Sequence, residues 1–118
     1  MHFMLAWGRP VGKSPLTAEE NKTLEQTLEG HSWASPCPGV YVVALTYGPE
    51  ERVDLRKKLK AKIEEASLGP VAYLLSPPIE SDAGFYVGAT DRETWNEVNR
   101  RSGHSDIVSK SLNEASEQ

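Results

Sequence analysis

The segment 31–39 holds the residue types with the most chemistry in this sequence: a histidine, a tryptophan and the only cysteine. A cysteine acts as a nucleophile when it is a thiolate, which requires a neighbouring base or cation. Cys37 lies between two prolines, which supply neither. We therefore expect an irregular binding loop in which Trp33 anchors the chain to the core and His31 makes contacts, and we do not expect a catalytic thiol.

Two other sets of residues have side chains suited to acid–base or metal chemistry. Glu80 and Asp82 are close enough in sequence to act as a pair, but they lie in a turn-like connection, where acidic side chains form local hydrogen bonds. The histidines at positions 2, 31 and 104 are scattered and do not have the spacing of a metal site. The sequence predicts neither a metal nor a cofactor.

The stretch from Gly8 to Ser14 follows a predicted strand and contains two glycines and a lysine, as a phosphate-binding loop does. Such a loop needs four residues between its glycines, whereas three separate Gly8 from Gly12, and Pro15 follows immediately. The pattern favours a simple basic loop, in which Arg9 is a candidate binding residue.

The second predicted helix carries six positive charges, and its apolar positions face the core, so most of these cations point outward. Such a face can follow a phosphate backbone, although neighbouring glutamates dilute its field. The cations are Arg52, Arg56, Lys57, Lys58, Lys60 and Lys62. They support the alternative interpretation of the chain as a nucleic-acid-binding protein.

Two tripeptides, Gly39-Val40-Tyr41 and Tyr86-Val87-Gly88, are followed by Arg92 and Glu97. This set resembles the two signature tripeptides of the GIY-YIG nucleases, and the resemblance implies a small nuclease. In that family the tripeptides lie on neighbouring strands a short loop apart. Here a whole helix and a strand separate them, so the family's catalytic arrangement is not carried over.

Composition limits the classes of protein that remain. The 118 residues suffice for one domain, and 13 Lys+Arg against 17 Asp+Glu leave a charge of -4, which argues against a protein held on nucleic acid by bulk electrostatics. The longest apolar run, 40–45, is far shorter than a membrane helix, and the first residues lack the basic region of a signal peptide. The single cysteine makes a reducing, cytoplasmic compartment the expectation.

Hydrophobic periodicity and breakers predict the element order β-α-β-α-β-β-α. We expect one α+β domain over residues 1–103 with a four-stranded, mainly antiparallel sheet, ferredoxin-like in architecture, followed by a polar tail over 104–118 that is flexible or dependent on a partner. Thr17 and Glu20 form a capping box at the first helix, and the last two strands form a hairpin. The expected strands are 3–7, 40–47, 71–75 and 85–89, and the expected helices begin after Thr17, Pro49 and Asp91.

The strands are apolar on both alternating sets of residues, which predicts that both faces of the sheet are covered. Leaving one such face in water would forgo about 25 cal/mol for each Å² of apolar area. The cover is a second copy of the chain, a ligand or the third helix, and a homodimer is the first expectation because two-fold pairs are the commonest oligomers.

These observations predict a small non-catalytic binding or interaction module, a homodimer whose aromatic and apolar sheet face holds a protein partner or a small apolar ligand. We expect no membrane association. The candidate binding residues are mostly aromatic: Trp7, Arg9, His31, Trp33, Tyr41, Tyr73 and Tyr86.

Overall fold

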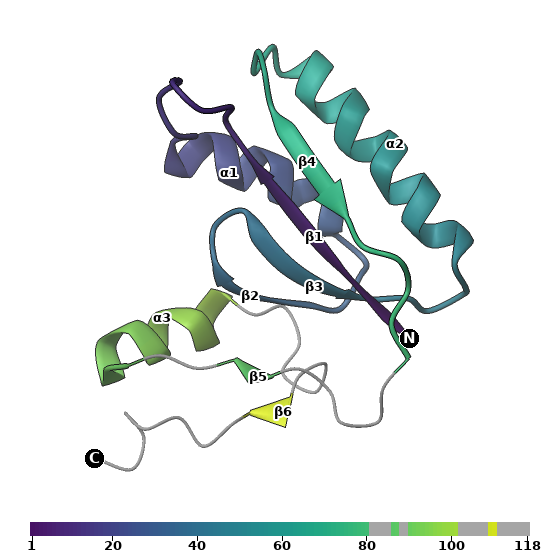
Figure 1. The fold of residues 1–118 in the computed structure, drawn as a ribbon, viewed down its shortest axis with the longest axis vertical. Coiled ribbons are helices and arrows are strands. Elements are labelled where there is room, and N and C mark those ends of the chain that lie inside the picture. Colours follow the sequence, from purple (N-terminus) through teal and green to yellow (C-terminus); the bar gives the residue numbers. More distant parts are fainter. Residues whose placement is uncertain (81–85, 88–89, 102–108, 111–118) are drawn as a thin grey trace.

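The computed structural model describes residues 1–80, 86–87, 90–101 and 109–110 of the chain (Figure 1). Its strands are β1 (His2–Gly8), β2 (Trp33–Cys37), β3 (Val40–Ala44), β4 (Ala72–Leu75), β5 (Tyr86–Val87) and β6 (Ser109–Lys110). Its helices are α1 (Ala18–Glu25), which a 3-10 turn continues over Gln26–Leu28, α2 (Glu50–Glu65) and α3 (Arg92–Arg101).

The first four strands form one antiparallel sheet in the order β2-β3-β1-β4. Because β1 and β2 are both antiparallel to β3, they run parallel to each other with β3 between them, and β3 and β4 likewise enclose β1. Each of the helices α1 and α2 therefore connects two parallel strands across an intervening one, which is the split βαβ topology that the term ferredoxin-like describes. The predicted α+β class with a four-stranded antiparallel sheet is confirmed.

Local signals set the helix ends. The Thr17 hydroxyl accepts a hydrogen bond from the Glu20 amide (3.1 Å), and the Glu20 carboxylate accepts one from the Thr17 amide (2.8 Å), so the predicted capping box is confirmed. These hydrogen bonds, led by the one from the Thr17 amide, hold the pKa of Glu20 below its usual value. At α3 the Asp91 carboxylate accepts a hydrogen bond from the Thr94 amide (2.7 Å), which lowers the pKa of Asp91 in the same way.

One face of the sheet, the first face, lies against α1 and α2. Alternate residues of β1 and β3 point into this core, where Tyr41 is fully buried. The core residues of the two strands and two helices are Phe3, Leu5, Trp7, Tyr41, Val43, Leu24, Leu28, Leu55 and Leu59. The other set of strand residues forms the opposite side of the sheet, which we call the second face.

The pairing of the strands differs from the prediction in two places. The segment 31–39 was expected to be irregular, but it contains β2, which tolerates Pro36 because the strand lies at the edge of the sheet and its register shifts between Ala34 and Cys37. The prediction that the last two strands form a hairpin is also wrong. The β4 strand pairs with β1, while β5 pairs with β6 in a separate parallel ladder.

A close approach in the β2–β3 turn explains the glycine at position 39. Gly39 has a φ of 94°, and a Cβ atom there would lie 2.7 Å from the backbone oxygen of Trp7. The Gly39 carbonyl also accepts a hydrogen bond from the Trp7 amide (2.9 Å). Only glycine fits this contact, which joins the β2–β3 hairpin to the end of β1.

The expected tail begins beyond α3, and β6 lies within it. The remaining residues of the predicted tail, together with Asp82, Phe85 and Ala89, lie outside the described residues.

Candidate functional site

The second face is divided between two strand pairs, and only one pair is covered. Val42 on β3 lies directly opposite Met4 on β1, yet Val42 is 6% exposed and Met4 is 44% exposed. Leu74 on β4, opposite Ala6, is 70% exposed. We call the part formed by Met4, Ala6, Ala72 and Leu74 the open half, and the part formed by Ala34, Val42 and Ala44 the covered half.

Helix α3 covers the covered half. Val98 is buried against Ala34 and Val42, and Trp95 packs against the same group. Figure 1 shows α3 lying beside β2, whereas α2 runs alongside β4. The third helix, one of the three covers considered from the sequence, therefore accounts for one part of the second face and leaves the other part to solvent.

A buried polar cluster ties α3 to the rest of the fold. The Arg101 guanidinium lies 2.6 Å from the Glu25 carboxylate on α1 and 3.3 Å from the Ser35 hydroxyl on β2. The Tyr41 hydroxyl donates to the same carboxylate and accepts a hydrogen bond from the Gly39 amide (3.1 Å). Arg101 thus reaches past the register shift of β2 and links α3 to the opposite side of the sheet.

The electrostatics of this cluster favour a charged Arg101 and a neutral Tyr41. Burial opposes the charge on Arg101, but the hydrogen bond and the charge of Glu25 outweigh it and raise the pKa of Arg101. Burial, together with the hydrogen bond to Glu25, raises the pKa of Tyr41 well above its usual value. Arg101 therefore stays charged and Tyr41 stays neutral at neutral pH, so both serve as structural contacts.

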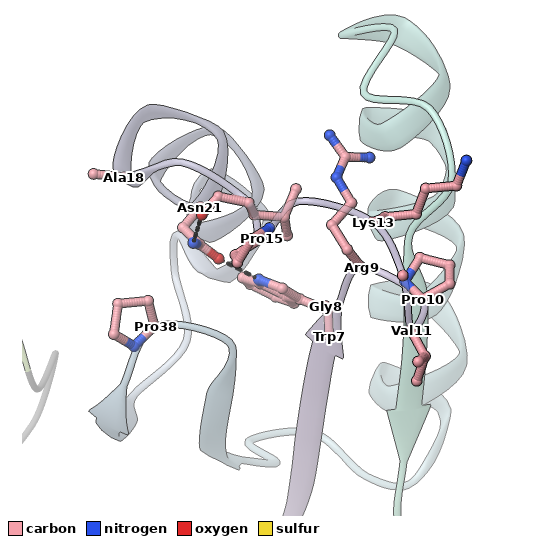
Figure 2. A pocket seen from close by; sticks show the side chains of 12 residues that line it. Trp7, Gly8, Arg9, Pro10, Val11, Lys13, Pro15, Ala18, Asn21 and Pro38 are labelled. Carbon is pink, nitrogen blue, oxygen red and sulfur yellow. Dashed lines mark hydrogen bonds between the residues drawn. The ribbon is translucent and has the colours of Figure 1, made fainter.

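A cavity of about 560 Å³ lies at the C-terminal end of β1, between the loop that follows the strand and the start of α1 (Figure 2). Trp7 and Asn21 point toward each other in it, and the indole nitrogen donates a hydrogen bond to the Asn21 side chain (2.8 Å). Lys13 lies at the exposed rim. The walls also include Pro15 and Pro38, so the cavity offers apolar surface and few polar groups.

Arg9 also lines this cavity, but its guanidinium is committed to structural contacts. It forms an ion pair with Glu20 (3.0 Å), a hydrogen bond to the Pro70 carbonyl (2.9 Å) and another to the Leu68 carbonyl. It therefore joins the end of β1 to α1 and to the segment before β4. The expected basic loop is present, and its arginine holds elements together.

The other predicted site residues are spread over the molecule. Tyr41 lies in the core of the first face. Its ring centroid is 4.4 Å from that of Trp7, with the two rings tilted by 36°, and Trp33 meets Tyr41 edge-on at 5.4 Å. The structure thus brings these three aromatic residues together, but under the helices instead of on the second face. His31 lies apart from them, with Nδ1 3.7 Å from the Glu51 carboxylate.

The remaining two predicted residues lie on other strands. Tyr73 on β4 lies opposite Trp7 of β1 and is 37% exposed at the edge of the sheet. Tyr86 lies in β5, paired in register with Ser109.

Sequence reasoning missed the two large apolar side chains that are exposed on the second face, Met4 and Leu74. Both strands are apolar on both sets of alternating residues. This pattern indicates that the second face is apolar, but it does not indicate which residues of that face are left uncovered. A better signal is the stretch 69–79, which contains no charged residue in a chain of which 25% is charged. An edge strand in such a stretch lacks the charges that usually protect an edge.

The cationic side of α2 is mostly exposed and little neutralised. Among the described residues, Lys62 forms an ion pair with Glu65 (3.9 Å), whereas no carboxylate is paired with Arg52 or Arg56. A shallow pocket of about 240 Å³ lies between these two arginines, Val53 and Leu75.

Comparisons with known proteins find no relative of the chain. No family model matches the chain, and neither the curated proteins nor the solved structures contain a match. Within the described part of the chain, no helix has both the length and the apolar character needed to cross a bilayer, and no cluster of three or more histidine, cysteine or acidic side chains is placed to hold a metal ion.

Proposed function

We propose that the protein is a small, non-catalytic interaction module that forms a homodimer through the open half of its second face. The exposure of Leu74 carries this proposal: a leucine that is 70% exposed lies in a sheet whose neighbouring half is sealed by α3. The covered half demonstrates that this sheet face is apolar enough to hold a helix. The open half offers the same chemistry to a partner.

The exposed leucines supply part of the free energy of a dimer. Burying a leucine side chain fully contributes about 1.5–3 kcal/mol, and two copies would together bury two Leu74 side chains. Loss of rotational and translational freedom offsets much of this gain. A micromolar dissociation constant, about −8 kcal/mol, therefore requires contacts in addition to these side chains.

The polar groups of the described residues support a binding role over a catalytic one. Arg9, Glu25 and Arg101 are engaged in contacts that join elements of the fold. The Glu51 carboxylate accepts hydrogen bonds from the backbone amides of Tyr47 and Gly48. These residues hold the scaffold in shape, which is what an interaction surface on a rigid sheet requires.

Sedimentation equilibrium tests the proposal. The wild-type chain should approach twice its mass of 13.0 kDa at concentrations of tens of micromolar, and Leu74→Asp should remain a monomer. Val11→Asp is the matched control, because Val11 is fully exposed on the loop that follows β1, outside the open half, and the same charge is added there. A monomeric wild-type chain, or dimers of Leu74→Asp as stable as those of the wild type, would overturn the proposal.

Nucleic-acid binding is the second candidate function, and the unpaired Arg52 and Arg56 on α2 favour it. Guanidinium groups recognise phosphate oxygens by paired hydrogen bonds. Titration with duplex and single-stranded oligonucleotides at two salt concentrations distinguishes the candidates. This second function predicts binding that weakens steeply with salt, whereas the first predicts no binding.

We further propose a cytoplasmic location for the module. Cys37 is free and exposed in the structure, and such a thiol persists best in a reducing compartment.

A further inference from the structure

The free edge of β4 has its backbone groups arranged for pairing. The Ser76 amide donates to the Met4 carbonyl (2.8 Å), which identifies this as a hydrogen-bonded pair of the antiparallel ladder. Such pairs alternate along two strands, so Leu74 bonds inward to Ala6. The amide and carbonyl groups of Tyr73 and Leu75 therefore point outward, away from the sheet.

The two edges of the sheet are built differently. At the β2 edge, the register shifts, Pro36 lacks a donor and Arg101 lies against Ser35. These features discourage a further strand. The β4 edge is regular and lies within the charge-free stretch 69–79, with the exposed Leu74 at its centre. An unprotected edge of this kind is a template for another strand.

We propose that two copies of the chain pair antiparallel along β4, with Leu74 of one copy directly opposite Leu74 of the other. This inference rests on the proposed homodimer and specifies how its copies meet. The outward amide and carbonyl of Tyr73 in each copy form hydrogen bonds with those of Leu75 in the other copy. These bonds join the two four-stranded sheets into one sheet of eight strands. Pro77 has no amide donor and ends the ladder.

A second copy suits this edge better than an unrelated strand for a geometric reason. An antiparallel pair has a two-fold axis, so an edge that presents two equivalent outward residues around Leu74 is complementary to itself. On the first face, Tyr73 then lies opposite Leu75 of the second copy. Leu75 borders the pocket between Arg52 and Arg56, so the exposed tyrosine ring meets cationic groups with which it interacts favourably.

Stacking the two second faces on each other is the competing arrangement. Helix α3 stands on that side of the sheet, so a second sheet cannot lie flat across the whole face. Stacking would also leave the outward groups of Tyr73 and Leu75 hydrogen-bonded only to water. Edge pairing satisfies these groups and brings the two exposed Leu74 side chains into contact, with Met4 of each copy one strand further away.

Disulfide trapping distinguishes the two arrangements. The variants are made in a Cys37→Ser background, which removes the native thiol. In the paired edge, the two Leu74 residues form a non-hydrogen-bonded pair, with a Cα separation of about 4.5 Å. This separation lies within the range for a disulfide. Met4→Cys is the main control, because three strand spacings and an offset of four residues along the strands place the two Met4 backbones roughly 20 Å apart. Ala72→Cys is the second, since four residues along the strands separate its two copies by roughly 13 Å.

With a mild oxidant at micromolar protein concentration, Leu74→Cys should form a covalent dimer on the order of 100-fold faster than Met4→Cys or Ala72→Cys, because pairing raises the effective thiol concentration to millimolar. Leu74 is exposed, so its replacement leaves the monomer folded, which circular dichroism verifies. If the wild type sediments as a dimer but Leu74→Cys crosslinks no faster than Met4→Cys, edge pairing is wrong and the proposed homodimer stands. If the wild type sediments as a monomer, both are wrong.

Discussion

Val42 and Met4 face each other across neighbouring strands and point to the same side of the sheet, but only Val42 is buried. The difference lies in what the chain places above them. Helix α3 lies over β2 and β3, where Val98 fills the space next to Ala34, and Met4 and Leu74 lie beyond its reach. The covered half thus stabilises the fold, whereas the open half stays exposed and is where we propose that a second copy binds.

Helix α3 is held in place by polar contacts as well as by apolar packing. Apolar burial at Val98 is small, but Arg101 adds an ion pair to Glu25 and a hydrogen bond to Ser35. No equivalent tether reaches the open half from the described part of the chain. An aspartate introduced at Val98, which packs on the covered half, should therefore destabilise the fold, whereas one introduced at Leu74, on the open half, should prevent association.

Val98→Asp should give the largest loss of stability. The new carboxylate would be placed against Ala34 and Val42 without a partner, at a cost of roughly 3 kcal/mol in the free energy of unfolding. Urea unfolding followed by circular dichroism measures this change. A loss below about 0.5 kcal/mol would mean that α3 does not pack as described.

Arg101→Ala should be the next most damaging change. It leaves the Glu25 carboxylate without its cation, and because both side chains retain some exposure, the expected loss is about 2 kcal/mol instead of the larger value of a fully buried pair. A double-mutant cycle with Glu25→Gln isolates the interaction. Additive losses in that cycle would show that the two residues act independently.

Leu74→Asp should leave the stability of the monomer almost unchanged, within about 0.5 kcal/mol, because the side chain already lies in water. Its effect should appear in association, where the dimer is lost. Urea unfolding at low protein concentration, compared directly with Val98→Asp, provides the test. A Leu74→Asp monomer as unstable as Val98→Asp would remove the distinction between the halves.

Low pH should slightly destabilise α3 on the covered half, because the Asp91 carboxylate caps this helix. The folded pKa of Asp91 is lowered, so its contribution to stability is present above the unfolded pKa and is lost as the pH falls through the folded pKa. Asp91→Asn keeps a capping oxygen without the charge. The difference in unfolding free energy between wild type and Asp91→Asn should therefore shrink as the pH falls from about 5 to below the usual aspartate pKa of about 3.9. A difference that stays constant over this interval would show that the Asp91 charge does not support the cap.

The features that were predictable from sequence are local ones. The capping box of Thr17 and Glu20 depends on residues three apart, and the end of α2 before Gly69 depends on a breaker, so both were recognised. Strand β2 was missed because Pro36 argues against a strand, and only the edge position and the register shift make it acceptable. Strand pairing depends on contacts between distant segments, which the spacing of residues does not encode.

The candidate site was harder to predict for a related reason. When both sets of alternating residues are apolar, the sequence does not state which set faces the helices. Trp7 and Tyr41 were consequently expected on a binding face, but they pack in the core. Met4 and Leu74 resemble any buried aliphatic residue, and only the position of α3 distinguishes them.

Methyl resonances measured while the protein is diluted test the central claim most directly. On dilution from about 1 mM to about 10 µM, the signal of Leu74 should move toward its monomer position, since micromolar association is partly reversed at the lower concentration. The signals of Val98 and Ala34 should not move, because α3 covers them in monomer and dimer alike. Shifts at Val98 and Ala34 with none at Leu74 would contradict the claim that the open half is where the second copy binds.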